Sequence, residues 1–273
     1  MYSRRRLAQK YLHYFFTAAN GKGHGVHSPF VFDFIIHVLN DRRRYPDYDM
    51  IEGLRGRLRR DETMLEVEDL GAGSAWKETR QRSIGDIVRR AAKAPRLGQL
   101  LYRIARYYKP SVMLELGTSL GFSAAYLAAG GRGGATGRPG EGGKLWTVEG
   151  SGQIAGVARK NLEFLGLDAE VIEGNFDEVL PGLLGRIGPV DLAFVDGNHR
   201  REASLSYFEQ LMGNAGERAL FVFDDIHWSA GMEEAWGAIT ADPRVYLTID
   251  LFFFGLVFLR DEFKVKQNFT IRY

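Results

Sequence analysis

Acidic residues follow two apolar segments of this chain, in positions where they could hold a metal ion or accept a proton. Asp196 ends the segment VDLAFVD, and Asp224 and Asp225 end the segment ALFVFDD. Because parallel strands deliver their last residues to one edge of a sheet, we expect the three carboxylates to converge. Like charges this close need a proton or a cation between them. The pattern therefore predicts that Asp196, Asp224 and Asp225 share a proton or hold a divalent cation.

The ligands and the general base at this edge have alternatives. An all-oxygen ligand set suits Mg²⁺, Mn²⁺ or Ca²⁺. In the alternative interpretation, Asp225 caps the helix that follows it and only Asp224 contacts a ligand. His199 and His227 follow the same two segments and titrate near neutral pH, so both are candidates for a general base. We place His227 first because it is nearest the acidic pair, and Asp196 is the third candidate if no metal binds.

A glycine turn lies at residues 112–128, VMLELGTSLGFSAAYLA. The apolar start predicts a short buried strand, and Gly117 and Gly121 allow the backbone to turn sharply and approach a ligand. A helix beginning near Ser123 would direct unpaired N–H groups at that ligand. The dinucleotide fingerprint requires glycine where Ser119 and Phe122 stand, so NAD is disfavoured. The turn predicts a site for another nucleotide-type cofactor.

A carboxylate follows the next apolar segment, LWTVE, which ends in Glu149, 32 residues after Gly117. Eight of the fourteen residues 130–143 are glycine, which indicates a flexible insertion. Subtracting this insertion brings the gap near the roughly 20 residues expected between a glycine turn and the acid that binds ribose hydroxyls. Glu149 is therefore predicted to bind the cofactor ribose.

The spacing E-x-G-x-x-x-G, formed by Glu115, Gly117 and Gly121 and followed by Phe122-Ser123, resembles motif I of class I S-adenosylmethionine-dependent methyltransferases. It is most similar to that of the catechol and caffeoyl-CoA O-methyltransferase branch. The resemblance implies S-adenosylmethionine as cofactor, bound by Glu115, Gly117, Thr118, Ser119, Gly121, Glu149, Asn175 and Asp196. It also implies a magnesium ion at Asp196, Asp224 and Asp225, with Asp225 standing where that family usually has asparagine.

Apolar segments alternate with helical patterns from residue 112 onward, which is typical of a parallel α/β sheet. We expect strands near residues 112–116, 144–149, 170–173, 190–195 and 219–224, a helix near 229–240, and two strands within 245–260 joined at Phe254-Gly255. The resemblance covers residues 96–273. It implies a Rossmann-like doubly wound sheet of seven strands in the order 3-2-1-4-5-7-6, with the last strand antiparallel.

Residues 1–95 indicate short helices separated by loops, which we interpret as a helical N-terminal cap or substrate region. The start, MYSRRRLAQKYLHYFFTAA, predicts an amphipathic helix rather than a signal peptide, and Ser28-Pro29 predicts a helix start. A second glycine segment, residues 68–74, precedes a polar stretch. It therefore lacks the buried helix that a cofactor turn requires.

The composition is that of an ordinary globular protein: 273 residues, 45% hydrophobic and 26% charged, with a formal net charge of +2. The absence of cysteine excludes disulfides, zinc-thiolate sites and a cysteine nucleophile, and fits the cytoplasm. The longest apolar block, Leu251 to Leu259, is too short to span a bilayer. The basic residues give no clear nucleic-acid signal, and a homodimer is compatible with the sequence.

These observations together favour O-methylation of a small-molecule acceptor, assisted by a divalent cation or by a histidine or aspartate base. One alternative is an RNA or protein methyltransferase. The Asp-Pro-Pro-Tyr type of motif used by amino-methylating nucleic-acid enzymes is replaced here by Asp196-Gly197-Asn198-His199, which lowers this alternative. A second is a non-catalytic module that binds the cofactor.

Overall fold

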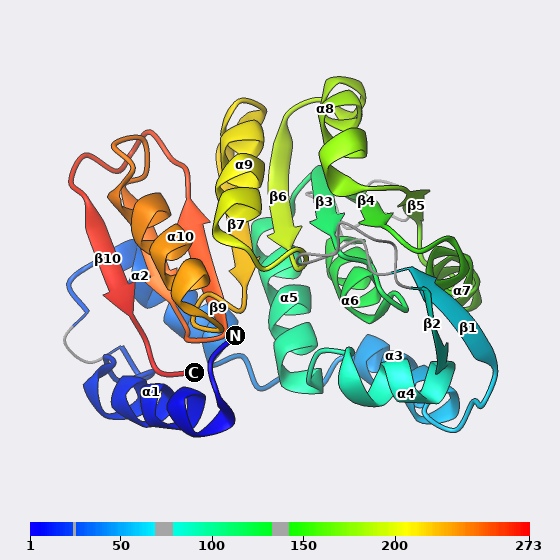
Figure 1. Cartoon of the computed structure of the whole chain (residues 1–273). Coiled ribbons are helices and arrows are strands. Elements are labelled where there is room, and N and C mark those ends of the chain that lie inside the picture. The colour runs from blue at the N-terminus through cyan, green and yellow to red at the C-terminus, as the bar shows by residue number, and fades with distance from the viewer. Residues whose placement is uncertain (24–25, 69–78, 133–141) are drawn as a thin grey trace. The chain divides into compact units, whose positions relative to one another are not determined.

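The computed structural model describes residues 1–23, 26–68, 79–132 and 142–273 (Figure 1). The chain divides into two compact units. One, which we call the split unit, joins Met1–Asp41 to Pro189–Tyr273, and the other, the central unit, is Arg42–Gly188. The region 1–95 that the sequence sets apart therefore contributes to both units.

The central unit contains three parallel strands with neighbours in the order β5-β4-β3, and helices around them. Its strands are β3 (Val112–Leu116), β4 (Lys144–Glu149) and β5 (Ala169–Glu173), and the helices after residue 94 are α5 (Pro95–Tyr108), α6 (Phe122–Gly131), α7 (Gly152–Phe164) and α8 (Phe176–Ile187). All ten residues of α6 are buried, as its uniformly apolar sequence requires. The glycine turn is thus followed by the buried helix that the sequence predicts.

The first part of the central unit consists of α3 (Pro46–Leu58), an antiparallel hairpin of β1 (Met64–Glu68) and β2 (Thr79–Ser83), and α4 (Ile84–Arg90). The hairpin is an addition to the helices expected here. The buried Tyr126 of α6 donates a hydrogen bond of 2.8 Å to Glu52 of α3, which ties the two helices together. Most of the second glycine segment and of the glycine-rich insertion lies outside the described residues, which omit 69–78 and 133–141.

The split unit contains β6 (Val190–Val195), β7 (Ala215–Asp224), β8 (Leu247–Asp250), β9 (Phe254–Phe258) and β10 (Gln267–Thr270). Their order is β6-β7-β9-β8-β10. β6 and β7 are parallel, β9 is antiparallel to both of its neighbours, and β10 is parallel to β8. The helices α9 (Arg201–Met212) and α10 (Ala230–Ala241) pack against each other beside these strands (Figure 1).

The expected α/β Rossmann-like fold is confirmed, with two differences in detail. Within each unit, the strand order agrees with the order that the resemblance implies. β10 is an additional strand that the sequence does not predict, because its residues are polar and its extended form depends on pairing with β8. The turn of the closing hairpin lies at residues 251–253, and not at Phe254-Gly255 as expected, since β9 already begins at Phe254. Phe252 turns the chain with φ of +70°.

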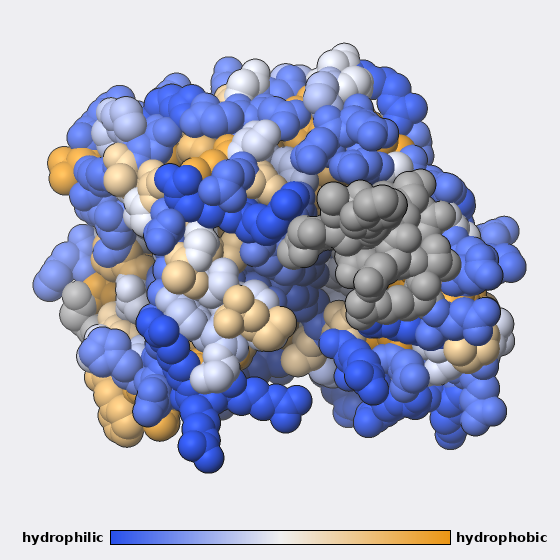
Figure 2. Space-filling model, viewed as in Figure 1, coloured by the Kyte–Doolittle hydropathy of each residue, from blue (hydrophilic) through white to orange (hydrophobic). Residues whose placement is uncertain are grey.

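The N-terminal part of the split unit contains α1 (Arg4–Thr17), α2 (Pro29–Phe34) and the π-helix η1 (Ile35–Leu39). Ser28 caps α2 as predicted. The amphipathic character of α1 is also confirmed, because Tyr14 and Ala18 are buried against Phe252. The face seen in Figure 2 is largely hydrophilic, with apolar side chains gathered at the lower left over α1. Among the described helices, none combines the length and the apolar character needed to cross a membrane.

Candidate cofactor and metal sites

The glycine turn of the central unit has the strained backbone that the sequence predicts. Gly117 and Gly121 adopt φ of +106° and +86°, and Ser119 between them adopts +47°. A side chain at these angles is unfavourable, so glycine suits the first two positions. The N–H groups of Gly117 and Thr118 donate to the carbonyl of Val148 at 3.0 and 3.2 Å, and this fixes the turn against β4. Gly121 then caps α6.

Glu115 lies at the base of this turn with no exposed surface. The Thr147 hydroxyl donates to its Oε2, whereas Oε1 has no hydrogen-bond partner among the described residues. Burial raises the pKa of Glu115 to about 7, opposed by hydrogen bonding from Ser123 and Thr147 and reinforced by the charge of Glu149. A buried carboxylate oxygen without a partner is a fit for a cationic ligand group, such as the ammonium of an amino-acid-bearing cofactor.

This pKa shift predicts a stability effect for Glu115→Gln. Between pH 4.5 and 7 the folded state retains a proton that the unfolded state has lost, so the stability of the wild type falls as the pH rises. Glutamine cannot ionise. From pH 4 to pH 8, we expect the free energy of unfolding of the wild type to fall by about 3 kcal/mol relative to that of the variant. Urea unfolding of both proteins at several pH values measures this difference. If the free energies of unfolding of the two proteins changed equally with pH, the assigned burial of Glu115 would be contradicted.

Glu149 occupies the position predicted for the ribose-binding acid. Its Oε2 accepts a hydrogen bond from the backbone N–H of Ser119 at 2.8 Å, and its Oε1 accepts one from Ser151 at 3.0 Å. Burial raises the pKa of this carboxyl, and the backbone hydrogen bonds oppose the rise. The side chain is therefore held beside the glycine turn at the carboxyl end of β4, where parallel sheets bind nucleotides.

Asn175 has a structural role that the sequence leaves open. Its side chain caps α8 by accepting a hydrogen bond from the N–H of Asp177 at 3.0 Å. Asparagine is among the best residues for capping a helix N-terminus, so this role explains Asn175 without any contact to a ligand. The adenine contact implied by the resemblance stays a prediction.

Two aspartates and a histidine gather in the split unit. Asp196 follows β6, Asp224 ends β7 with 1% of its surface exposed, and His199 lies three residues after Asp196. One ligand atom from each lies within 4.8 Å of the other two, and His199 Nε2 is 3.7 Å from Asp196 Oδ1. Two carboxylates and one imidazole suit a divalent cation such as Mn²⁺, Fe²⁺ or Zn²⁺ and are less selective for Mg²⁺ than an all-oxygen set.

Asp225 lies outside this group of three, although the sequence predicts it as a ligand. Its backbone has φ of +53°, its N–H donates to the carbonyl of Phe253 at 2.8 Å, and its carbonyl accepts from Trp228 at 2.9 Å. It does not cap the following helix, because Ser229 caps α10. The group therefore contains His199 beside Asp196 and Asp224, and the role of Asp225 as a ligand stays a prediction. The shared loop of Asp196 and His199 is the signal in the sequence that could have indicated His199.

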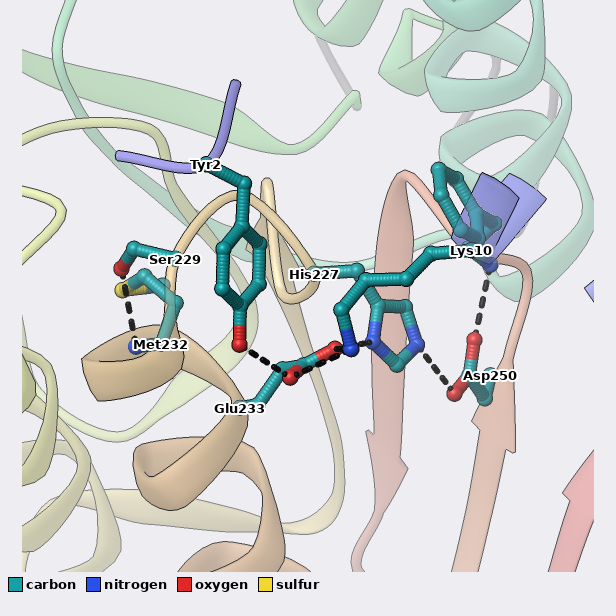
Figure 3. A network of polar contacts seen from close by, with 8 residues as sticks. Tyr2, Lys10, His227, Ser229, Met232, Glu233 and Asp250 are labelled. Atoms are coloured by element: carbon teal, nitrogen blue, oxygen red, sulfur yellow. Dashed lines mark hydrogen bonds and ion pairs between the residues drawn. The ribbon is translucent and has the colours of Figure 1, made fainter. Parts of the chain in front are cut away.

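His227 lies in a separate polar network with Glu233 and Asp250 (Figure 3). Its Nδ1 is 3.0 Å from Glu233 Oε1, and its Nε2 is 2.8 Å from Asp250 Oδ2. Burial disfavours the imidazolium, but the two carboxylates outweigh it and raise the pKa of His227. Because both ring nitrogens already face carboxylates, neither is available to a substrate hydroxyl. This geometry favours His199 over His227 as a base.

The same network also includes residues that the sequence did not identify. Glu233 accepts hydrogen bonds from Tyr2 and Lys10 as well as from His227, and the N–H of Tyr2 donates to the carbonyl of Trp228 at 3.0 Å. These contacts tie the N-terminal segment to the loop after β7. They depend on residues more than 200 positions apart, so no local pattern could have revealed them.

Comparison with known proteins agrees with this geometry. Residues 114–226 match a family model described as a methyltransferase domain. They include the glycine turn, Glu149 and the group of Asp196, His199 and Asp224. Residues 114–226 are therefore similar to a methyltransferase domain, and the fold that holds them is Rossmann-like.

Among curated proteins, the chain is similar to catechol O-methyltransferases. It is 32% identical over 150 residues to that of Mycobacterium tuberculosis, covering 52% of this chain and 63% of the relative. It is 29% identical over 136 residues to that of Niastella koreensis, covering 49% and 57%. The chain thus spans about three fifths of the length of these relatives. The resemblance to class I O-methyltransferases of the catechol type is confirmed.

Solved structures share the fold. A putative O-methyltransferase from Klebsiella pneumoniae has a TM-score of 0.56 at 19% identity, covering 82% of this chain and 94% of its own. An O-methyltransferase from Bacillus cereus in complex with SAH has a TM-score of 0.55 at 18% identity, covering 83% and 96%.

Proposed function

We propose that this chain is an S-adenosylmethionine-dependent methyltransferase (EC 2.1.1.-) that methylates a hydroxyl oxygen of a small molecule. The observation that carries the proposal is the hydrogen bond between Ser119 of the glycine turn and Glu149 at the end of β4. It holds a carboxylate where a nucleoside ribose would lie, beside a turn that lacks the glycines of the dinucleotide fingerprint at Ser119 and Phe122. The match of residues 114–226 to a methyltransferase domain supports the same cofactor.

In this proposal, each polar group around the glycine turn has an assigned task. S-adenosylmethionine supplies a methyl group on a sulfonium, which is already activated for transfer. Glu149 binds the ribose hydroxyls, and Oε1 of Glu115 accepts a hydrogen bond from the cofactor ammonium. The N–H groups at the start of α6 lie at the same turn and suit a carboxylate. The main catalytic contribution is then the in-line positioning of the methyl donor and the acceptor oxygen.

The acceptor hydroxyl loses its proton when the oxygen–methyl bond forms. Where no cation is bound, His199 and Asp196 are the groups we assign to take that proton, because His227 is occupied by Glu233 and Asp250. Asp196, His199 and Asp224 would hold a divalent cation, which supplies a lowered pKa to a hydroxyl group bound beside it.

Calorimetric titration of S-adenosylmethionine into the purified chain, with and without Mg²⁺ or Mn²⁺, tests the proposal. We expect binding by the wild type and none by Gly117→Trp, whose side chain would fill the turn. Incubation with isotope-labelled cofactor and catechol should then label the phenol. Absence of cofactor binding would refute the proposal, and binding without transfer to any phenol would favour a macromolecular acceptor or a non-catalytic module.

We further propose a homodimer and a cytoplasmic location, both of which rest on the sequence. The closing hairpin offers little apolar surface for a dimer, because Phe252 and Phe254 are only 3% and 0% exposed and Phe253 is 37% exposed. Leu12 and Phe16 of α1 are 54% and 76% exposed and offer a better one. Light scattering of the purified chain and of Phe16→Ser measures the assembly, and cell fractionation tests the location.

A further inference from the structure

A second polar cavity of about 510 Å³ lies within the split unit, apart from the group of Asp196, His199 and Asp224. One wall is α1, and the other is formed by the start of α10 and by residues at the carboxyl ends of β8 and β10. The volume falls within the range of small-molecule sites. The cavity also shares the sheet edge at which open α/β folds bind ligands, because β8 and β10 run parallel to β7.

The hydrogen-bond acceptors of this cavity are already occupied (Figure 3). Glu233 accepts from Tyr2 at 2.8 Å, from Lys10 at 2.8 and 2.9 Å, and faces His227 Nδ1 at 3.0 Å. Asp250 faces His227 Nε2 at 2.8 Å and accepts from the N–H of Phe252 at 2.7 Å. The two carboxylates are therefore neutralised from within the protein, and they leave little capacity for a cationic ligand.

The donors are not. Arg6, Lys10 and His13 lie at helical spacing along the wall formed by α1. Within the described chain, the side chains of Arg6 and His13 make no hydrogen bond or ion pair, and Arg6 only stacks over the ring of Tyr2 at 4.3 Å. α1 carries three arginines, one lysine and one histidine and no acidic residue. A cavity with occupied carboxylates and with donors that have no partner selects a ligand that brings acceptors, which is an anion.

The floor of the cavity is aromatic. Phe252 stacks on His227 with ring centroids 5.1 Å apart, and Tyr14 lies 5.2 Å from the same phenylalanine. Phe252 holds this position in the left-handed region, with φ of +70°, which is unfavourable for a bulky residue. Strain of this kind is concentrated at ligand sites. The floor favours a planar apolar body next to the anionic group.

We propose that this cavity binds an aromatic carboxylate, with the carboxylate toward Arg6 and His13 and the ring toward Tyr14 and Phe252.

Calorimetry of the full chain with benzoate and with benzyl alcohol tests the cavity directly. Benzoate should bind the wild type and bind Arg6→Gln about 10-fold to 100-fold more weakly, because a charged hydrogen bond is lost. Arg5→Gln, a neighbouring substitution outside the cavity lining, should change the affinity less than about twofold. Benzyl alcohol should not distinguish the three proteins, and thermal unfolding checks that each is folded. Equal benzoate affinity in Arg6→Gln and wild type would overturn the site.

Discussion

Replacing Asp224 by asparagine is expected to lower kcat/KM for a phenolic acceptor by at least about 100-fold, because one of the three charged or basic groups of the candidate metal site loses its charge. Asp224 is 1% exposed, and a ligand atom of it lies within 4.8 Å of ligand atoms of Asp196 and His199. Asparagine preserves the shape of the side chain. The affinity for Mn²⁺ or Mg²⁺, measured by calorimetry, should fall in parallel.

Asp225→Asn is the matched control for this variant. It makes the same chemical change one residue later, outside the group of three ligands, and asparagine tolerates the left-handed backbone of Asp225 at φ of +53°. We expect activity and cation affinity within about threefold of the wild type, as for an ordinary surface substitution. Equal losses in the two variants would show that the acidic pair holds the cation, as the sequence alone predicts.

Glu149→Gln is expected to weaken the binding of S-adenosylhomocysteine by about 100-fold, since two hydrogen bonds from ribose hydroxyls to a charged acceptor become neutral ones. The amide also places an N–H₂ group opposite the N–H of Ser119 or of Ser151, both of which now donate to the carboxylate. Calorimetry gives the affinity directly, without dependence on the acceptor.

Glu173→Gln offers the control, because Glu173 is the register partner of Glu149 on the adjacent strand β5 and is exposed. The two variants remove the same charge from the same edge of the central unit. The affinity of Glu173→Gln should remain within about twofold of the wild type. A comparable loss in both would indicate a general electrostatic effect and would contradict a specific role of Glu149.

Local sequence determined the elements that carry the cofactor turn. Apolar runs as short as Val112–Leu116 are buried strands, and Gly117 and Gly121 fall at positive φ where only glycine is relaxed. Glu149 could be identified because a carboxylate that ends a parallel strand has a defined place at the sheet edge. These features depend on interactions between residues close in sequence or on a repeated strand–helix pattern.

Tertiary structure alone decided which polar side chains meet. The sequence placed both Asp225 and His227 at the acidic edge of the sheet. Asp225, with its backbone at φ of +53°, lies outside the group of Asp196, His199 and Asp224. His227 is paired with Glu233 and Asp250. β10 also escaped detection, because its order comes from pairing with β8. The direction of a side chain on a loop depends on partners far away in the chain, such as Tyr2 and Lys10 for Glu233. Local propensity carries no information about such partners, and only the folded chain brings them together.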